Sequence, residues 1–116
     1  MRARRKDANQ DAIVEMYEKL GCSVQSLHTV GGGCPDLAIG VAGMNGFAEI
    51  KDGNKAPSKR RLTKDQLPWH EAWMGEVRIV EREEDVMTHV QELRWKAYQI
   101  RKAESYGMAR YGDDGK

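Results

Sequence analysis

The sequence predicts a single α/β domain in which a small mixed sheet is covered by helices. Apolar residues recur at helical spacing near both ends of the chain. Between these helices, short runs of alternating or β-branched residues bounded by Gly, Pro and Asn are typical of strands. The resulting order is helix, three strands, helix, strand and helix, and 116 residues suffice for one such domain. A mixed sheet with helices packed on it is the simplest way to bury the apolar faces of these elements.

The first predicted element is a helix over Ala8–Leu20. Its apolar residues recur at i, i+3, i+4 and i+7, which places them on one face. Asp7 and Gln10 have the spacing of a capping box, and Gly21 stands where a helix commonly ends. We expect the cation-rich residues 1–6 to form a mobile basic arm. The apolar stripe consists of Ile13, Met16, Tyr17 and Leu20.

Three strands are predicted next, over Cys22–Thr29, Leu37–Val41 and Phe47–Lys51. Three consecutive glycines at 31–33 break the chain between the first two strands and are interpreted as a flexible connection. Turn-forming residues at 42–45 separate the second strand from the third. Because so few residues separate these two strands, we expect them to form an antiparallel hairpin.

A polar loop over 52–62 leads to a helix that begins between Thr63 and Gln66 and ends near Met74. Pro68 lacks a backbone N–H group, so the first turn of this helix must accommodate it or the helix must kink.

The last predicted elements are a strand over Val77–Val80 and a helix that begins at Glu83. An apolar stripe at helical spacing predicts this helix. The Gly- and Asp-rich tail over 107–116 is expected to fray. The stripe consists of Val86, Val90, Leu93, Ala97 and Ile100.

Composition restricts the class of protein. Hydrophobic residues make up 40% of the chain and charged residues 32%, with a net charge of +1. This near neutrality excludes a histone-like protein that binds its partner through its overall charge, although local clusters of charged residues can still be strong. No apolar run is long enough to span a membrane, and no signal peptide is recognisable, so we expect a protein of the bacterial or virus-infected host cytoplasm.

The two cysteines, Cys22 and Cys34, do not predict a disulfide framework or a zinc site. They lack C-x-x-C spacing, and a reducing compartment would keep them as thiols. Zinc would need two further ligands from the histidines, none of which has the spacing of a zinc finger. The histidines are His28, His70 and His89. His70 could face the candidate site from the helix after the polar loop, but we favour its interpretation as an ordinary surface residue.

Charged residues beside the predicted hairpin form the candidate site. Asp36 stands directly before the second strand, while Glu49 and Lys51, two residues apart, project from one face of the third. Charges in so short and apolar a strand are costly unless they are used. Two carboxylates and an ammonium group fit a hard divalent cation, Mg²⁺ or Mn²⁺, that binds a substrate phosphate. The alternative is a turn-capping Asp36 and an exposed Glu49–Lys51 ion pair.

These residues also resemble a known nuclease motif. Gly33-Cys34-Pro35-Asp36 followed by Glu49-Ile50-Lys51 resembles the PD-(D/E)XK motif, and Leu62-Thr63-x-x-Gln66 and Trp73-x-Gly75 resemble its VRR-NUC branch. The resemblance covers roughly residues 5–90. It implies a restriction-endonuclease-like core with the order α-β-β-β-α-β-α. It also implies a small stand-alone metal-dependent DNA endonuclease, similar to Holliday-junction resolvases, that acts on branched or junction DNA.

The resemblance implies a role for each matching residue. Asp36 and Glu49 would bind the metal, with the backbone carbonyl of Ile50 completing the inner shell. Lys51 would be the catalytic lysine.

Two glutamines complete the implied site. Gln66 would contact the substrate or a metal-bound water, although with Thr63 it also fits a capping box. Many relatives have an acidic residue in the first helix, and here Gln10 occupies that position, with Asp11 and Glu15 close by.

A basic segment follows the motif. Residues 51–64 contain six cationic side chains and one acidic side chain, a local net charge of +5. Such a segment suits binding of a DNA backbone without reading bases, and the alternative is a solvated loop. The residues predicted to bind DNA are Lys55, Lys59, Arg60, Arg61 and Lys64.

The position of the hairpin turn decides whether the site can exist. Asn45-Gly46 is a strong two-residue turn signal, but a turn there would place Asp36 roughly 20 Å from Glu49. A turn centred earlier, within 41–45, brings Asp36 level with Glu49. We predict this earlier turn, with Gly46 at its exit or in a bulge.

Two other functions remain open at this point: a catalytically silent nucleic-acid-binding module with the same fold, and a scaffold protein that uses the last helix. Trp69 and Trp73, four residues apart, are interpreted as packing residues rather than base-stacking platforms. Since a cutter of branched DNA needs two sites, we expect a homodimer with two-fold symmetry.

Overall fold

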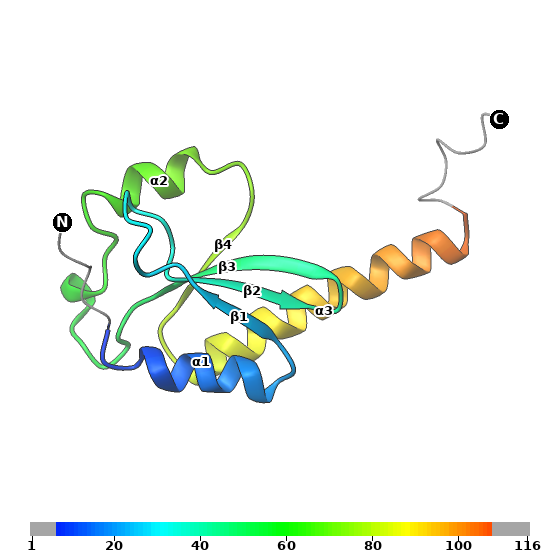
Figure 1. The fold of residues 1–116 in the computed structure, drawn as a ribbon, viewed down its shortest axis with the longest axis horizontal. Helices are drawn as coiled ribbons and strands as arrows, with labels where there is room; N and C mark the ends of the chain where they lie inside the picture. Colours follow the sequence, from blue (N-terminus) through cyan, green and yellow to red (C-terminus); the bar gives the residue numbers. More distant parts are fainter. Residues whose placement is uncertain (1–6, 108–116) are drawn as a thin grey trace.

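A computed structural model of the chain describes residues 7–107. Its centre is a four-stranded sheet in the order β1-β2-β3-β4 (Figure 1). The strands are β1 (Ser23–Ser26), β2 (Leu37–Val41), β3 (Met44–Ile50) and β4 (Val77–Val80). β2 is antiparallel to both β1 and β3, whereas β4 is parallel to β3. The mixed sheet expected from the sequence is therefore confirmed.

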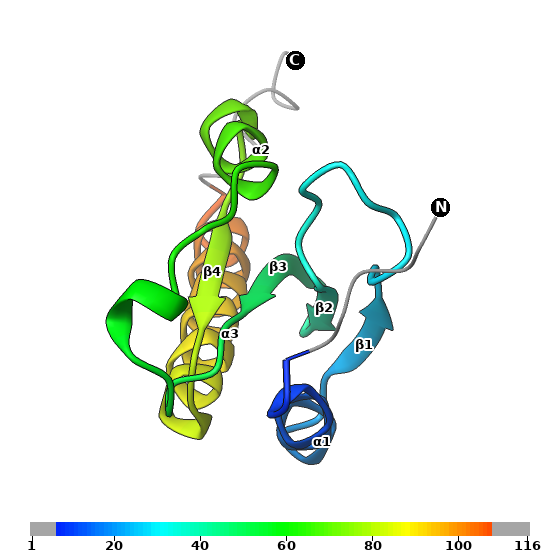
Figure 2. The ribbon, with the colours of Figure 1, turned by 90° about the vertical axis from the view of Figure 1, so that its left-hand side faces the viewer.

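The helices cover both faces of the sheet. α1 (Gln10–Lys19) and α3 (Glu83–Ser105) lie on one face, and α2 (Gln66–Ala72) lies on the other (Figures 1 and 2). A single 3₁₀ turn, η1 (Pro57–Lys59), lies in the loop between β3 and α2. Pro68 is in the first turn of α2, where backbone N–H groups have no partner inside the helix, so the helix accommodates it.

The hydrophobic core lies between the sheet and the pair α1 and α3. Side chains along β2 alternate between buried and partly exposed, which is expected of a strand with one face on the core. Glu49 and Lys51 project from the opposite face, toward α2, because side chains at alternate positions share a face. The core is formed mainly by Ile13, Tyr17, Leu37, Ile39, Ala48, Ile50, Val80, Val86, Val90 and Leu93.

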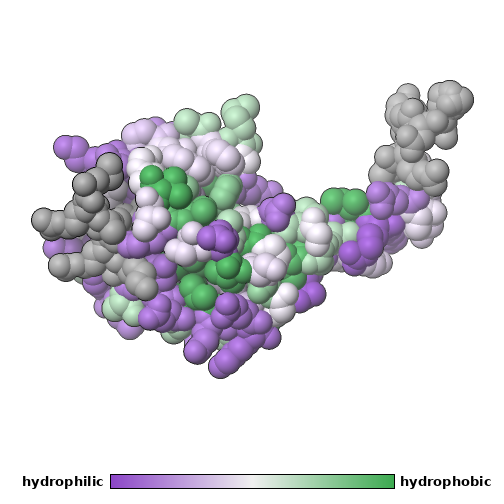
Figure 3. Space-filling model, viewed as in Figure 1, coloured by the Kyte–Doolittle hydropathy of each residue, from purple (hydrophilic) through white to green (hydrophobic). Residues whose placement is uncertain are grey.

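The second half of α3 extends beyond the sheet (Figure 1). Val86, Val90 and Ala97 are buried as predicted, but Ile100 is 46% exposed, so the predicted apolar stripe is wrong at this end. The reason is that the helix continues past the last strand it covers. Figure 3 shows that this projecting part carries both hydrophobic and strongly hydrophilic residues.

The start of α1 is tied to the ends of two strands. The side chain of Asn9 donates hydrogen bonds to the carbonyls of Lys51 and Glu81, each at 3.1 Å. Asn9 is also the residue that precedes the helix, and its side chain makes no capping hydrogen bond at this end. The capping box predicted from Asp7 and Gln10 is therefore wrong: the Gln10 amide donates to the backbone carbonyl of Asp7, at 3.1 Å, instead of to its side chain.

The hairpin turn lies at the earlier of the two predicted positions. Val41 pairs with Met44, so the turn consists of Ala42 and Gly43, both with positive φ. The expectation for Gly46 is wrong, because it is a regular strand residue opposite Ile39. A side chain there would meet the ring of His89, which lies 3.0 Å from the position of its Cβ.

The glycine run before β2 is more than a flexible connection. Gly33 has φ +84°, and a Cβ added to it would lie 2.0 Å from the carbonyl oxygen of Asp65. Only glycine allows this approach, which fixes the loop before Asp36 against the residue that precedes α2.

The basic arm over 1–6 and residues 108–116 of the predicted tail lie outside the described residues. Within residues 7–107, no helix combines the length and the apolar character that crossing a membrane requires.

Candidate active site

The hairpin brings the two motif carboxylates together. Leu37 pairs with Ala48, so the next position of the same register places Asp36 beside Glu49 on one face. Asp36 accepts a hydrogen bond from the Ile50 amide at 2.7 Å, across the end of the hairpin. Both carboxylates are withdrawn from solvent, with Asp36 5% and Glu49 1% exposed. This is the arrangement that the earlier turn predicts.

A glutamine from α2 joins the other two motif residues. The Lys51 ammonium group donates to Gln66 Oε1 at 2.7 Å, and Gln66 Nε2 donates to Glu49 Oε2 at 2.9 Å. All three side chains are buried. Glu49 and Lys51 therefore form part of a buried hydrogen-bonded network, and the alternative of an exposed ion pair is excluded by their burial.

Gln66 also caps the start of α2. The Thr63 amide donates to Gln66 Oε1 at 2.9 Å, and the Gln66 amide donates to Thr63 Oγ1 at 3.2 Å. These reciprocal bonds are those of a capping box. The capping interpretation of Gln66 is thus confirmed, and the same side chain also contacts Glu49 and Lys51. Its contact with a substrate or a metal-bound water stays a prediction.

His70 belongs to this site, and its interpretation as a surface residue is wrong. Its Nε2 lies 3.4 Å from Glu49 Oε1, and its side chain is 11% exposed. Burial lowers the pKa of His70, and the positive charge of Lys51 lowers it further. The signal in the sequence is its spacing: His70 follows Gln66 by four residues, so both lie on one face of α2.

A comparison with solved structures finds a chain described as a VRR_NUC domain. The two chains are 30% identical and superpose with a TM-score of 0.53, over 71% of this chain and 89% of the other. The chain belongs to the VRR-NUC family. This is a nuclease-type family, and the membership confirms both the resemblance and the restriction-endonuclease-like fold. No protein-family model matches the chain, and no curated protein does.

Gln10 is the residue by which the start of α1 reaches toward the site in this VRR-NUC chain. Gln10 is 4% exposed, and its side-chain oxygen has no hydrogen-bond partner among the described residues. It lines a groove with Ser26 and His28, and the neighbouring Leu27 amide donates to the Asp36 carbonyl at 2.8 Å. Gln10 therefore lies at the Asp36 end of the sheet.

Asp7, which precedes α1, lies close enough to the motif residues for their charges to act on its carboxyl group. Burial raises the pKa of the Asp7 carboxyl, the charge of Lys51 opposes this shift, and the charge of Asp36 adds to it. These influences place Asp7 in the electrostatic environment of the motif residues. The resemblance to the family points to an acidic residue inside the first helix, whereas Asp7 precedes α1, and nothing in the helical periodicity points to this position.

The basic segment over residues 51–64, or basic loop, contains two kinds of cationic residue. Arg60 is partly buried and pairs with Glu81 at 2.9 Å, so it ties the loop to the end of β4. The other four predicted DNA-binding residues are exposed. They are Lys55, Lys59, Arg61 and Lys64.

Proposed function

We propose that the protein is a divalent-metal-dependent DNA endonuclease that hydrolyses phosphodiester bonds. The observation that carries this proposal is the buried cluster in which Glu49, Lys51 and Gln66 are hydrogen-bonded and the hairpin register places Asp36 beside Glu49. Membership of the VRR-NUC family supports it independently. Buried charges of both signs at one place are costly unless they serve a function.

The donor atoms fit Mg²⁺ or Mn²⁺. Among residues 7–107, no group of three or more His, Cys, Asp and Glu side chains converges as a metal site. Hard cations of this kind need only one or two carboxylates, with water, carbonyl and phosphate oxygens as further ligands. Asp36, Glu49 and the Ile50 carbonyl would hold the ion. The side-chain oxygen of Gln10, which has no hydrogen-bond partner within residues 7–107, would face a water at this end of the sheet. The bound metal would supply an acidified water and would stabilise negative charge on the phosphate.

The protein side chains perform the remaining tasks. The ammonium group of Lys51 donates to the scissile phosphate or orients the attacking water, and its bond to Gln66 fixes it in place. Gln66 and His70 each contact one oxygen of Glu49, which restricts the rotation of that carboxylate. The site is thus held before a substrate binds.

The exposed cations of the basic loop would bind the DNA backbone beside this site. We further propose a branched or junction substrate and a homodimer, because cutting both strands at a branch needs two sites. A two-fold symmetric pair would present these sites to the two strands of one substrate.

Incubation with branched, nicked and linear DNA in Mg²⁺, in Mn²⁺ and in EDTA tests the function. We expect cutting with either metal, none in EDTA, and preference for the branched substrate. Cutting in EDTA would contradict the metal site. DNA binding without any cutting would identify the protein as the silent binding module instead.

Neutralising the exposed cations of the basic loop is expected to weaken DNA binding equally for all sequences. Lys59→Gln and Arg61→Gln should each reduce the slope of log affinity against log salt by roughly one unit, since each phosphate contact releases counterions. Binding titrations at several salt concentrations measure this slope. Arg101→Gln, an exposed cation on α3, is the matched control. Unchanged slopes for Lys59→Gln and Arg61→Gln would mean that the loop is only solvated.

A further inference from the structure

Three aromatic rings lie together on the site face of the sheet. Trp69 and Trp73 stack with their planes 12° apart and their centroids at 4.6 Å. Phe47 packs edge-on against both, at 5.9 and 5.1 Å. Trp73 nevertheless remains 44% exposed, so its ring is held in place on one side and faces solvent on another.

This aromatic cluster (Phe47, Trp69 and Trp73) continues directly from the candidate active site. α2 runs along β3 in the opposite direction, because Gln66 contacts Lys51 while Trp73 contacts Phe47. Phe47 precedes Glu49 by two residues and shares its face, a separation of roughly 7 Å along the strand. A DNA strand whose phosphate lies at Glu49 would therefore have a neighbouring nucleotide at the aromatic cluster.

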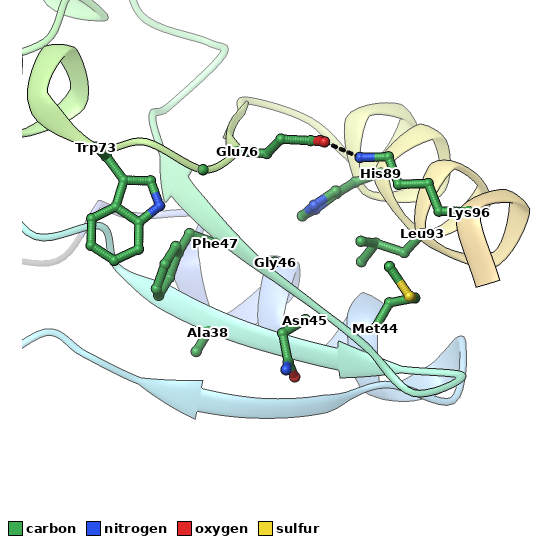
Figure 4. Close-up of a pocket in the computed structure, with 11 residues that line it drawn as sticks. Ala38, Met44, Asn45, Gly46, Phe47, Trp73, Glu76, His89, Leu93 and Lys96 are labelled. Atoms are coloured by element: carbon green, nitrogen blue, oxygen red, sulfur yellow. Dashed lines mark hydrogen bonds and ion pairs between the residues drawn. The ribbon is translucent and has the colours of Figure 1, made fainter. Parts of the chain in front are cut away.

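A groove opens beside the cluster, with a volume of about 580 Å³ (Figure 4). It exists because β4 begins opposite Phe47, so the preceding residues of β3 have no neighbour from β4. Trp73 and Phe47 line one side, and His89 and Leu93 from α3 line the other. Asn45 also lines the groove and is exposed, and its side-chain amide offers a hydrogen-bond donor and an acceptor.

The chemistry of the groove matches a nucleobase. Flat aromatic faces bind bases by stacking, and a ring already fixed by its neighbours loses little conformational freedom on binding. A mostly apolar groove with a few polar groups is typical of sites for small planar ligands. A base inside a paired duplex is stacked on its neighbours and cannot enter, whereas an unpaired base can.

We infer that this groove binds an unpaired base next to the phosphate that is cut, with Trp73 as the stacking platform. The inference rests on the proposed nuclease function and specifies its substrate: DNA in which a nucleotide adjoining the cleavage site is unpaired. The interpretation of Trp73 as a packing residue alone is replaced by a double role, because Trp69 forms the packed layer and Trp73 the exposed one.

The test compares two branched DNA molecules that differ only in their unpaired nucleotides, which are normal in one and abasic in the other. The phosphates are identical, so backbone attraction cancels. Fluorescence anisotropy in EDTA measures affinity without cutting. The wild-type chain is expected to bind the base-containing molecule about 5- to 100-fold more tightly. Trp73→Ala should lose most of this preference.

Two further variants make the result specific. Trp95→Ala, which removes an indole of similar exposure on α3, should keep the preference. Ala38→Leu, which fills the groove and leaves Trp73 in place, should lose it. Equal wild-type affinity for both DNA molecules would overturn the inference even if Trp73→Ala failed to fold, and so would an unchanged preference in a folded Trp73→Ala.

This result is separable from the proposed nuclease function. If the base preference is absent but Mg²⁺-dependent cutting is present, only the groove assignment fails. If the preference is present but no DNA is cut with any metal, only the nuclease function fails.

Discussion

Asp36→Asn, Glu49→Gln and Lys51→Met are each expected to abolish DNA cutting while the chain still folds. The loss should be at least about 100-fold, because each change removes a charge that the reaction needs and nearby groups cannot replace. The replacements keep the size of the side chains, so the packing beside the core is preserved. Turnover with Mg²⁺ and thermal unfolding by circular dichroism measure the two effects.

Binding gives this prediction a second readout. Asp36→Asn and Glu49→Gln remove negative charge that repels phosphate, so affinity for DNA should be unchanged or higher. Glu71→Gln is the matched control, because Glu71 is an exposed carboxylate on α2 next to His70. Cutting by Glu49→Gln at a rate near that of the wild type would contradict the assignment of this site as the active site.

Gln66→Ala is expected to reduce cutting by about 10- to 100-fold, the range typical of residues that orient a ligand of a metal. Its loss leaves the Lys51 ammonium group and the Glu49 carboxylate without the amide that links them. The substitution also weakens the start of α2, so turnover alone cannot identify the cause.

Thr63→Ala separates the two roles of Gln66. It removes the hydroxyl that accepts a hydrogen bond from the Gln66 backbone amide. The hydrogen bonds of the Gln66 side chain to Lys51 and Glu49 stay intact. A smaller loss of activity in Thr63→Ala than in Gln66→Ala, at comparable thermal stability, would support the orienting role. Equal losses would show that Gln66 acts only as a cap.

Local patterns in the sequence predicted most of the fold. Strands β2 and β4 and the start of α3 have the predicted bounds, because their apolar patterns agree with the burial that the fold gives them. The turn is different: Asn45-Gly46 is the stronger local signal, yet Ala42 and Gly43 form the turn. Tertiary packing decides here, since His89 occupies the space beside Gly46.

The candidate site was predictable only where a motif spans it. Asp36, Glu49, Lys51 and Gln66 share a spacing that resembles the family, and the structure brings them together. His70, Asp7 and Asn9 are brought to the site by tertiary contacts between distant segments. The four-residue spacing from Gln66 points to His70, whereas no periodicity encodes the contacts of Asp7 and Asn9, so these two residues could be found only from the structure.

The two-residue turn at Ala42 and Gly43 has a consequence for insertions and deletions. Asp36 and Glu49 lie side by side because equal numbers of residues lead from each to the turn. Adding one residue to each strand would lengthen the hairpin and keep the carboxylates paired, whereas adding one residue to a single strand would turn one carboxylate into the core. The distance in sequence between the two acids can therefore change only in steps of two, unless a bulge absorbs the odd residue. The parity of this gap, more than its length, is what a functional variant of this hairpin must preserve.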